Sequence, residues 1–379
     1  MLKHIDRVDE ITDSDTMVGY DGVNMSEFTV PSKKEVRRAG EILKQEPPSS
    51  FEDFEKAFNT LSIWRSLHSY PINTFQALIR KKIKDLNILD ALVAQRLKRA
   101  PSIIKKLERF PKMQLDRMQD IGGVRVVVNH IEEVYSIHSS LSRARIKHQA
   151  VLPPHDYIKF PKSDGYRSLH QVFRYNSDTH PELNGLSIEV QIRTKLQHSW
   201  ATAVETLGII EKSSFKTGEG SEKIKRFFKL SSAIFSIEEN LPILDEYKEK
   251  GALEIVEEFE ELQNELRIFK KLAGLTFSAK QIESVGDNKN AYHVIVLDTD
   301  KMTVSLTPFS PKQLHMAEQF YKSMEIGTKN MKNIDVVLIS AGNLKDIKKA
   351  YPNYFLDTQV FIKSLNRICN RISKYKKII

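Results

Sequence analysis

The sequence predicts an α+β protein in two parts: a domain with a β-sheet flanked by helices, and a small C-terminal α/β module. Up to residue 99 hydrophobic residues recur with helical spacing, whereas Val124–Val128 and later segments alternate with period two. Strand patterns interleaved with helix patterns indicate an α+β or α/β domain. A second group of strand patterns follows residue 290, and 379 residues are more than one compact core usually holds.

The N-terminal extension, residues 1–50, is expected to be irregular and polar apart from one helix over Lys33–Leu43, which Ser32 can cap. Residues 51–99 are predicted to be helical, and Pro101 is expected to break the pattern. Within them one set of hydrophobic residues has three- and four-residue spacing, as the buried stripe of a helix does. Its members are Phe51, Phe54, Phe58, Leu61 and Trp64.

Alternating patterns beyond residue 120 predict the sheet of the main domain, which we assign to residues 51–210. Gly122-Gly123 bounds the first strand, and the last strand alternates strictly, so that one of its faces is apolar and the other polar. The expected elements are strands over Val124–Val128, Leu169–Tyr175 and Ile188–Ile192, with helices over 131–145 and Lys195–Leu207.

Two further segments complete the chain. Residues 211–273 are predicted to form a linker and connecting helices, because Glu211–Lys223 is rich in Ser, Gly, Lys and Glu and long helical patterns follow it. Residues 274–379 are predicted to form the separate α/β module. Its expected elements are strands over Tyr292–Leu297, Met302–Leu306 and Ile334–Ile339, a helix over Pro311–Met324, and a helical segment over Leu344–Asn370 with a break at Pro352.

Composition limits the class of protein. The formal net charge is +9, and Arg80–Arg117 holds twelve Lys or Arg against four Asp or Glu, which favours a polyanionic partner. No apolar run approaches the roughly 20 residues that span a bilayer, so no membrane partner is expected. The segment Met1–Glu10 is too charged for a signal peptide, and the single cysteine, Cys369, excludes an internal disulfide and a cysteine-rich zinc site. We therefore expect a cytoplasmic protein.

Two segments hold carboxylates in positions suited to a reaction. Asp120 shortly precedes a predicted strand, where it can face a cleft, although an Asp before Gly-Gly is commonly a turn former. On the last predicted strand, Glu189, Gln191 and Arg193 share one face, so an acid, an amide and a guanidinium lie in a row. Such a row suits a polyphosphate and its metal ion, and it is equally compatible with an ordinary solvent-facing strand.

Two basic segments accompany these carboxylates. A glycine-containing loop places Tyr166 among three cations, where the ring can stack on a base while the cations meet phosphates. These cations are Lys159, Lys162 and Arg167. Gly165 stands alone, without a following Gly-Lys-Ser/Thr, which excludes a P-loop. The other segment, Arg96–Ile103, concentrates cations at the helix end that Pro101 is expected to close.

These segments, in this order, resemble the RelA/SpoT-type synthetase domain of alarmone synthetases over residues 51–210. The motifs PKSDGYRSLH and EVQIRT carry the resemblance, and Asp120–Arg125 completes the set. The resemblance implies a nucleotidyltransferase-like mixed sheet and an ATP-dependent pyrophosphokinase. In that reaction a ribose hydroxyl attacks the β-phosphorus of ATP, the β,γ-diphosphate is transferred and AMP leaves. It also implies Mg²⁺ as the cofactor.

The resemblance further implies roles for individual residues. Asp120 and Glu189 resemble the magnesium-binding carboxylates, and Glu189 can also accept the proton of the attacking hydroxyl. Arg96 and Arg125 resemble the pair that sandwiches the adenine of ATP. The residues implied for the donor phosphates are Lys98, Ser102, Lys105 and Arg117. Tyr166 resembles the residue that stacks the acceptor base, with His170, Gln191 and Arg193 around it, and we expect Lys159, Lys162 and Arg167 of the loop to bind the acceptor as well.

A second resemblance covers the C-terminal module and the segment Gln197–Glu205. Both resemble the toxic small synthetases fused to an antitoxin-like domain, the CapRel toxin–antitoxin proteins of antiviral defence. This implies tRNA as the acceptor, self-inhibition, and a phage protein that binds the module as the trigger. An inhibitory module must present a surface to the active-site domain, and aromatic residues are enriched in such interfaces. We therefore predict as regulatory residues Tyr351, Tyr354 and Asp357. Core packing at helical spacing would explain the two tyrosines equally well.

Other functions stay open on the sequence alone. A GTP or GDP pyrophosphokinase that makes the alarmone (p)ppGpp would also have a basic site. A catalytically dead RNA-binding or sensor module is disfavoured, because both carboxylates, Tyr166 and the arginines are present. An N-terminal hydrolase domain is not expected, since residues 1–75 contain only His4 and His68, and the His155-Asp156 pair lies in the acceptor loop.

Overall fold

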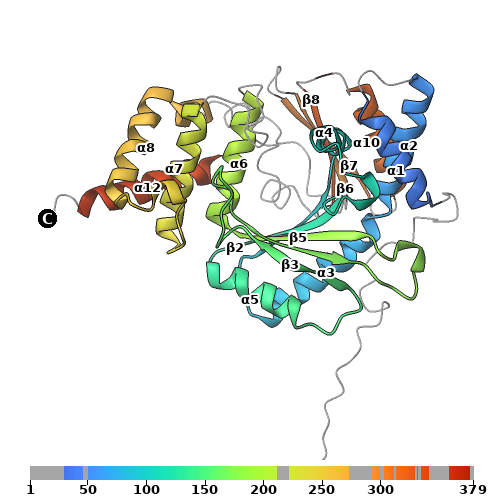
Figure 1. The fold of residues 1–379 in the computed structure, drawn as a ribbon, viewed down its shortest axis with the longest axis horizontal. Coiled ribbons are helices and arrows are strands. Elements are labelled where there is room, and N and C mark those ends of the chain that lie inside the picture. The colour runs from blue at the N-terminus through green and yellow to red at the C-terminus, as the bar shows by residue number, and fades with distance from the viewer. Residues whose placement is uncertain are drawn as a thin grey trace, which may run out of the picture.

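The computed structural model describes residues 30–45, 50–210, 222–272, 292–298, 303–310, 313–328, 331, 334–340 and 358–375. Its larger part is built on a five-stranded sheet with the strand order β1-β2-β5-β4-β3 (Figure 1). The strands are β1 (Leu92–Leu97), β2 (Gly122–Val128), β3 (Gln149–Asp156), β4 (Leu169–Arg174) and β5 (Ser187–Thr194). β2 and β5 run parallel at the centre and the other neighbouring strands are antiparallel, so the predicted α+β fold with a mixed sheet is confirmed.

Helices lie on both faces of this sheet (Figure 1). They are α1 (Lys33–Leu43), α2 (Phe51–Ser66), α3 (Ser69–Asp85), α4 (Ala100–Arg109), α5 (Ile131–Ser142) and α6 (Lys195–Ile210). α3 and α5 pack together under one face, whereas α6 and α4 rise from the opposite face at its two ends. The polar row of β5 therefore lies on the face that α4 and α6 flank.

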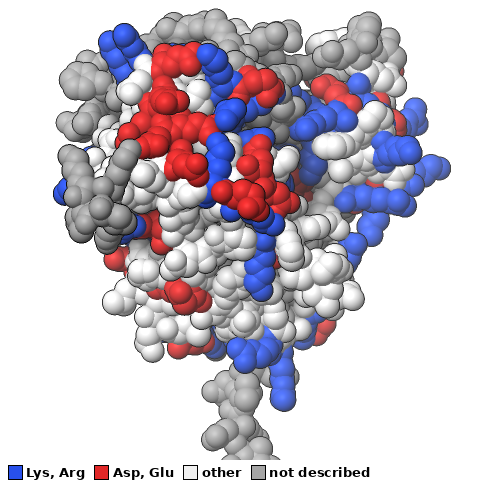
Figure 2. Space-filling model, turned by 60° about the vertical axis from the view of Figure 1, so that its left-hand side comes forward, with Lys and Arg blue, Asp and Glu red and all other residues white. Residues whose placement is uncertain are grey.

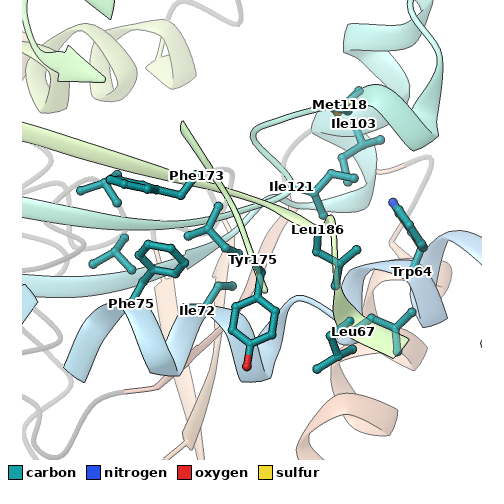
Figure 3. Close-up of a cluster of buried hydrophobic side chains, with 14 of the residues drawn as sticks. Trp64, Leu67, Ile72, Phe75, Ile103, Met118, Ile121, Phe173, Tyr175 and Leu186 are labelled. Carbon is teal, nitrogen blue, oxygen red and sulfur yellow. The ribbon is translucent and has the colours of Figure 1, made fainter. Parts of the chain in front are cut away.

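The face of the sheet that meets α3 and α5 forms the main hydrophobic core (Figure 3). Ile188, Val190 and Ile192 are fully buried there, which confirms the apolar half of the alternation predicted for β5. From α3, Phe75 packs against Phe173 of β4, with ring centroids 5.1 Å apart. Because successive side chains of a strand point to opposite faces, the residues between these apolar ones project away from this core.

Predictions for the first two helices were partly right. Ser32 caps the helix Lys33–Leu43 as expected, and Glu35 completes a capping box with it. On α2 the predicted stripe is buried at Phe58, but Phe51 is 80% exposed. Phe51 is the first residue of α2, and the core does not extend to this end of the helix.

The prediction of helix up to residue 99 was wrong for its last part. α3 ends at Asp85, and Leu92–Leu97 forms the edge strand β1, which pairs antiparallel with β2. Pairing with a neighbouring strand stabilises this conformation, and a local helix pattern carries no information about that neighbour. Pro101 consequently does not end a helix; it lies in the first turn of α4, where the missing N–H would have no helical partner anyway.

The remaining elements form a helical cluster and a second, small sheet. They are α7 (Glu222–Glu238), α8 (Ala252–Leu266), β6 (Tyr292–Asp298), β7 (Thr303–Phe309), α10 (Leu314–Gly327), β8 (Ile334–Ser340) and α12 (Gln359–Tyr375). The three strands that the sequence patterns predicted are present, and they form an antiparallel sheet with the order β7-β6-β8.

The last helix lies apart from the small sheet in its packing. Phe361, Leu365 and Ile368 of α12 are fully buried in a core shared with α6, α7 and α8. The segment 274–379 thus contributes its final helix to the connecting helices that precede it in sequence. The predicted regulatory residues Tyr351, Tyr354 and Asp357 lie outside the described residues.

Charges are distributed unevenly over the surface. Figure 2, in which the side of the molecule that carries α8 is turned forward, shows Asp and Glu gathered in one area. Exposed acidic residues of α8 include Glu254, Glu257, Glu260, Glu261 and Glu265. No helix in the described part of the chain has the length and hydropathy that a bilayer-spanning segment requires.

Candidate active site

The two candidate carboxylates come from the paired central strands. Asp120 lies two residues before β2, and Glu189 of β5 is in register with Gly123 of β2. A Cβ atom on Gly123 would lie 2.5 Å from the backbone carbonyl oxygen of Glu189, so this close approach of the strands requires glycine. The glycine pair that bounded the predicted strand therefore has a structural role beside the site.

Asp120 is held by two ammonium groups. Its Oδ2 accepts a hydrogen bond from Lys98 Nζ at 3.0 Å, and its Oδ1 accepts one from Lys106 Nζ at 2.9 Å. Burial alone would raise the pKa of Asp120, but the charges of Lys98 and Lys106 outweigh it and lower that pKa to about 2. Asp120 is therefore ionised at neutral pH.

Glu189 is held by uncharged or weakly basic groups. His170 Nδ1 lies 2.8 Å from its Oε1, and Gln191 Nε2 donates to its Oε2 at 2.7 Å. Burial and the negative charge of Asp120 would raise the pKa of Glu189, but the hydrogen bond and charge of His170 keep it below its ordinary value. Tyr166 Oη lies 2.9 Å from His170 Nε2, so one chain of contacts joins Tyr166, His170 and Glu189.

Arginine side chains converge beside the carboxylates. Arg193 and Arg125 are 3% and 8% exposed, and Arg193 contacts His198 Nδ1. Burial, followed by the like charges of Arg125 and Arg96, lowers the pKa of Arg193 to about 9. Arg193 Nε is buried and has no hydrogen-bond partner among the described residues. A region in which guanidinium groups repel one another is suited to receive a polyanion.

The loop before β4 carries the exposed lysines of the site. Lys162 Nζ lies 4.5 Å from the ring centroid of Tyr157 and 5.1 Å from that of Tyr166. Lys159 Nζ lies 5.2 Å from the ring centroid of Tyr135. Both lysines are exposed and Tyr166 is half-buried, so an aromatic ring and two cations are accessible at the rim of the site.

The comparisons with known proteins agree with this geometry. The region found in RelA / SpoT proteins matches residues 95–219. The GTP pyrophosphokinase YjbM of Bacillus subtilis is 32% identical over 153 residues, which are 39% of this chain and 69% of that protein. The chain belongs to the RelA/SpoT family. The GTP pyrophosphokinase YwaC of Bacillus subtilis is 30% identical over 118 residues, which are 28% of this chain and 52% of that protein.

Among solved structures, the small alarmone synthetase 1 of Bacillus subtilis is 23% identical to this RelA/SpoT chain, with a TM-score of 0.41. The match covers 47% of this chain and 91% of that one. The family match ends at residue 219, so the small sheet and α12 lie beyond it.

One residue that was assigned to the acceptor because of its charge has another position in the structure. Arg167 is 3% exposed and donates hydrogen bonds to the carbonyl oxygens of Ile158 at 2.9 Å and Pro242 at 2.6 Å. Its Nε also donates to Ser232 Oγ of α7 at 3.4 Å. With its guanidinium engaged in this way, Arg167 ties the acceptor loop to the chain around α7 and does not face an acceptor phosphate.

The donor assignments are also revised on α4. Lys105 is exposed, whereas Lys106, which the sequence prediction omitted, contacts Asp120. Lys105 and Lys106 lie three and four residues after Ser102, so spacing along the helix does not separate them, and the contact with Asp120 decides between them. Arg117 lies in the short 3₁₀ turn Leu115–Arg117 and is exposed. Lys98 lies against Asp120, while His170 and Gln191 lie against Glu189.

Proposed function

We propose that this chain is an ATP-dependent pyrophosphokinase, which transfers the β,γ-diphosphate of ATP to a nucleotide hydroxyl and releases AMP. The observation that carries the proposal is a pair of ionised carboxylates, Asp120 just before β2 and Glu189 on the neighbouring β5, with lysine and arginine side chains around them. Carboxylates can hold a divalent cation, and the surrounding cations can neutralise a triphosphate. The names of the relatives YjbM and YwaC support the same reaction class.

On the donor side, Lys98, which follows β1, and Lys106 of α4 would bind the phosphates of ATP. Lys98 and Lys106 already hold carboxylate oxygens of Asp120, and phosphate oxygens brought beside Asp120 would share these two cations. Arg96 and Arg125 would hold the adenine between their guanidinium planes. Charge that develops on phosphate oxygens during transfer is thereby stabilised by groups that are already in position.

Mg²⁺ is the proposed cofactor, held by Asp120 and Glu189. Both are oxygen donors with lowered pKa values, which suits a hard cation. No group of three or more His, Cys, Asp or Glu side chains placed to hold a metal occurs among the described residues, and Mg²⁺ commonly takes its other ligands from phosphates and water. When bound, the ion supplies electrostatic stabilisation of the transferred phosphates.

On the acceptor side, Tyr166 would stack the base and Glu189 would accept the proton of the attacking hydroxyl. The contacts of His170 and Gln191 fix both oxygens of Glu189, so its carboxylate is oriented before substrate arrives. Lys159 and Lys162 would approach acceptor phosphates from the rim.

We infer that the acceptor is the 3′ end of tRNA, with GDP or GTP as the second candidate. A shallow cavity of about 490 Å³ between α3 and α5 is lined by Lys82, Arg143 and three serines. Tyr135 lines the same cavity and hydrogen-bonds Asp156 at the start of the acceptor loop. Lys82 and Arg143 of this cavity, with Lys159 of the acceptor loop over the ring of Tyr135, would suit an RNA backbone. The relatives' names favour the guanosine nucleotide.

The acceptor proposal predicts that reversing two charges on α3 will selectively impair tRNA. Lys81→Glu/Lys82→Glu should reduce transfer of label from γ-³²P-ATP to tRNA by about tenfold or more, because lost phosphate contacts weaken binding. ATP binding should be unchanged. Lys34→Glu/Arg38→Glu, on exposed positions of α1, is the control with the same change in net charge. Label that appears only in guanosine tetra- or pentaphosphate would refute tRNA as the acceptor.

We also propose that the C-terminal module restrains the enzyme, so that the full chain is a self-inhibited toxin of antiviral defence that a phage protein releases. The contact of α10 with the first residue of α4 supports this, since Glu325 Oε1 lies 3.2 Å from Ala100 N. A module in the same chain acts at a high effective concentration, so even a weak contact can inhibit. A phage protein that binds the released state better than the restrained one would shift the balance.

Self-inhibition by the C-terminal module predicts that cells tolerate the full chain. It also predicts that Tyr351→Ala/Tyr354→Ala or Asp357→Ala alters the inhibition. Cells that express these variants should grow more slowly after induction than cells that express the unaltered chain, and labelling of tRNA by the variants should rise in parallel. The same substitutions combined with Asp120→Asn should be harmless, which separates toxicity of the reaction from toxicity of misfolding. Growth and labelling equal to those of the unaltered chain would contradict the role of this segment.

The test keeps the chain intact for a structural reason. Truncation after residue 273 would remove Phe361, Leu365 and Ile368 from the core that α12 shares with α6, α7 and α8. Exposure of that core favours an insoluble fragment, and a truncated chain would therefore report on folding as much as on inhibition.

A further inference from the structure

α10 of the C-terminal module lies beside α2 of the synthetase domain (Figure 1), and a buried polar cluster joins the two helices. Its centre is Arg65, which is 3% exposed. Arg65 Nη1 donates to Glu325 Oε2 at 2.9 Å, and Nη2 donates to Tyr321 Oη at 2.7 Å. Tyr321 and Glu325 are 5% and 4% exposed and also hydrogen-bond each other. Their spacing of four residues places them on one face of α10.

The same cluster contacts the backbone of residues 98–100, which lead from β1 into α4 and which we call the donor segment. Arg65 Nε donates to the carbonyl oxygen of Lys98 at 2.9 Å, and the amide of Ala100 donates to Glu325 Oε1 at 3.2 Å. Arg99, the N-cap residue of α4, makes no capping hydrogen bond with its side chain. Glu325 therefore supplies an acceptor to the start of α4 from another part of the chain.

This arrangement neutralises two groups that would otherwise attract anions. Arg65 carries a full positive charge, and the N-terminus of α4 carries the partial positive charge of its free amides. The carboxylate of Glu325 pairs with the guanidinium of Arg65 and accepts a hydrogen bond from the first amide of α4. Arg65 and Glu325 contact the donor segment, which includes Lys98 and continues into α4. Lys98 and Lys106 of α4 both donate hydrogen bonds to Asp120. Docking of α10 thus lowers the positive potential next to the proposed donor phosphates.

We propose that the Arg65–Tyr321–Glu325 cluster is a latch that couples docking of α10 to donor binding. When α10 is docked, Glu325 neutralises the Arg65 guanidinium and the N-terminus of α4. When α10 is released, these two positive groups are free beside the triphosphate, and ATP binds more tightly. Coupling of this kind is reciprocal, so ATP must loosen α10 by the same factor. The inference rests on the proposed ATP site and adds the contact by which the module regulates it.

The test uses the full chain and the probe α,β-methylene-ATP. Glu325→Gln keeps the size of the side chain and removes its charge, and Lys322→Gln is the control on the same helix. Lys322 is half-exposed and makes a rim contact to Asn59, so its replacement should change little. We expect Glu325→Gln to tighten probe binding by about fivefold or more, and to speed amide hydrogen exchange of residues 314–327. The control should stay within about twofold on both measurements.

The reciprocal arm uses the unaltered chain, so it does not depend on folding of a variant. Saturating α,β-methylene-ATP should speed exchange of residues 314–327 by about fivefold or more. Probe binding that is unchanged or weakened in Glu325→Gln, or exchange of α10 that does not respond to the probe, would overturn the latch alone. Absence of probe binding in every variant would refute the ATP site and the latch together.

Discussion

Replacement of either central carboxylate, Asp120→Asn or Glu189→Gln, is expected to abolish pyrophosphate transfer, with a loss on the order of a hundredfold or more. Each substitution keeps the size of the side chain but removes the charge that would hold Mg²⁺, and Glu189→Gln also removes the proton acceptor. The measurement is transfer of label from γ-³²P-ATP to tRNA and, separately, to GDP or GTP. A rate above about a tenth of that of the unaltered chain would refute the metal role of that residue.

A matched control for this experiment is Asp116→Asn. Asp116 is also a carboxylate near β2 and pairs with Arg37 at 2.9 Å, but it lies outside the proposed metal site. Its loss should change thermal stability modestly and leave transfer within about twofold, because the pair is half-exposed on the arginine side. Thermal unfolding of all three variants then distinguishes lost chemistry from lost structure. Inactivity of Asp116→Asn with its fold intact would mean that acid loss in this region impairs transfer non-specifically.

The second large effect is expected on α4. Lys106→Met should reduce kcat/KM for ATP on the order of a hundredfold, because it removes a cation that contacts Asp120 and would contact the donor phosphates. Lys105→Met, one position away and exposed, should stay within about threefold. Initial rates at varied ATP concentration measure both. If Lys105→Met proved the more damaging, the donor site would follow the sequence assignment and the side-chain placement of Lys106 would be wrong.

The central part of the fold could be predicted from local patterns. Ile188, Val190 and Ile192 alternate with polar residues, and a strand with one apolar face has this pattern wherever it occurs. The edge strand β1 could not be predicted in this way. Leu92–Leu97 is a strand because β2 offers it a row of hydrogen-bonding partners, and nothing within those six residues specifies that partner.

The candidate site shows the same division. The motifs led to the prediction of Asp120 and Glu189, and the structure places Asp120 two residues before β2 and Glu189 on the neighbouring strand β5. Residue type alone could not separate Lys105 from Lys106, because adjacent residues of a helix point in different directions and only the position of Asp120 decides which one makes the contact. Arg167 was assigned to phosphate by its charge, whereas its burial directs it to carbonyl oxygens.

What the sequence by itself determined is the α+β domain and the three strands of the small second sheet, since short-range periodicity specifies each of them, while its motifs singled out Asp120 and Glu189 as the predicted catalytic carboxylates. Only the tertiary structure decided that α12 packs with α6, α7 and α8 and that Arg65 of α2 is neutralised by Glu325 of α10. Arg65 and Glu325 are 260 positions apart. Burial makes an unpaired charge unfavourable, so each requires the other, but this requirement arises only once folding has removed both from water.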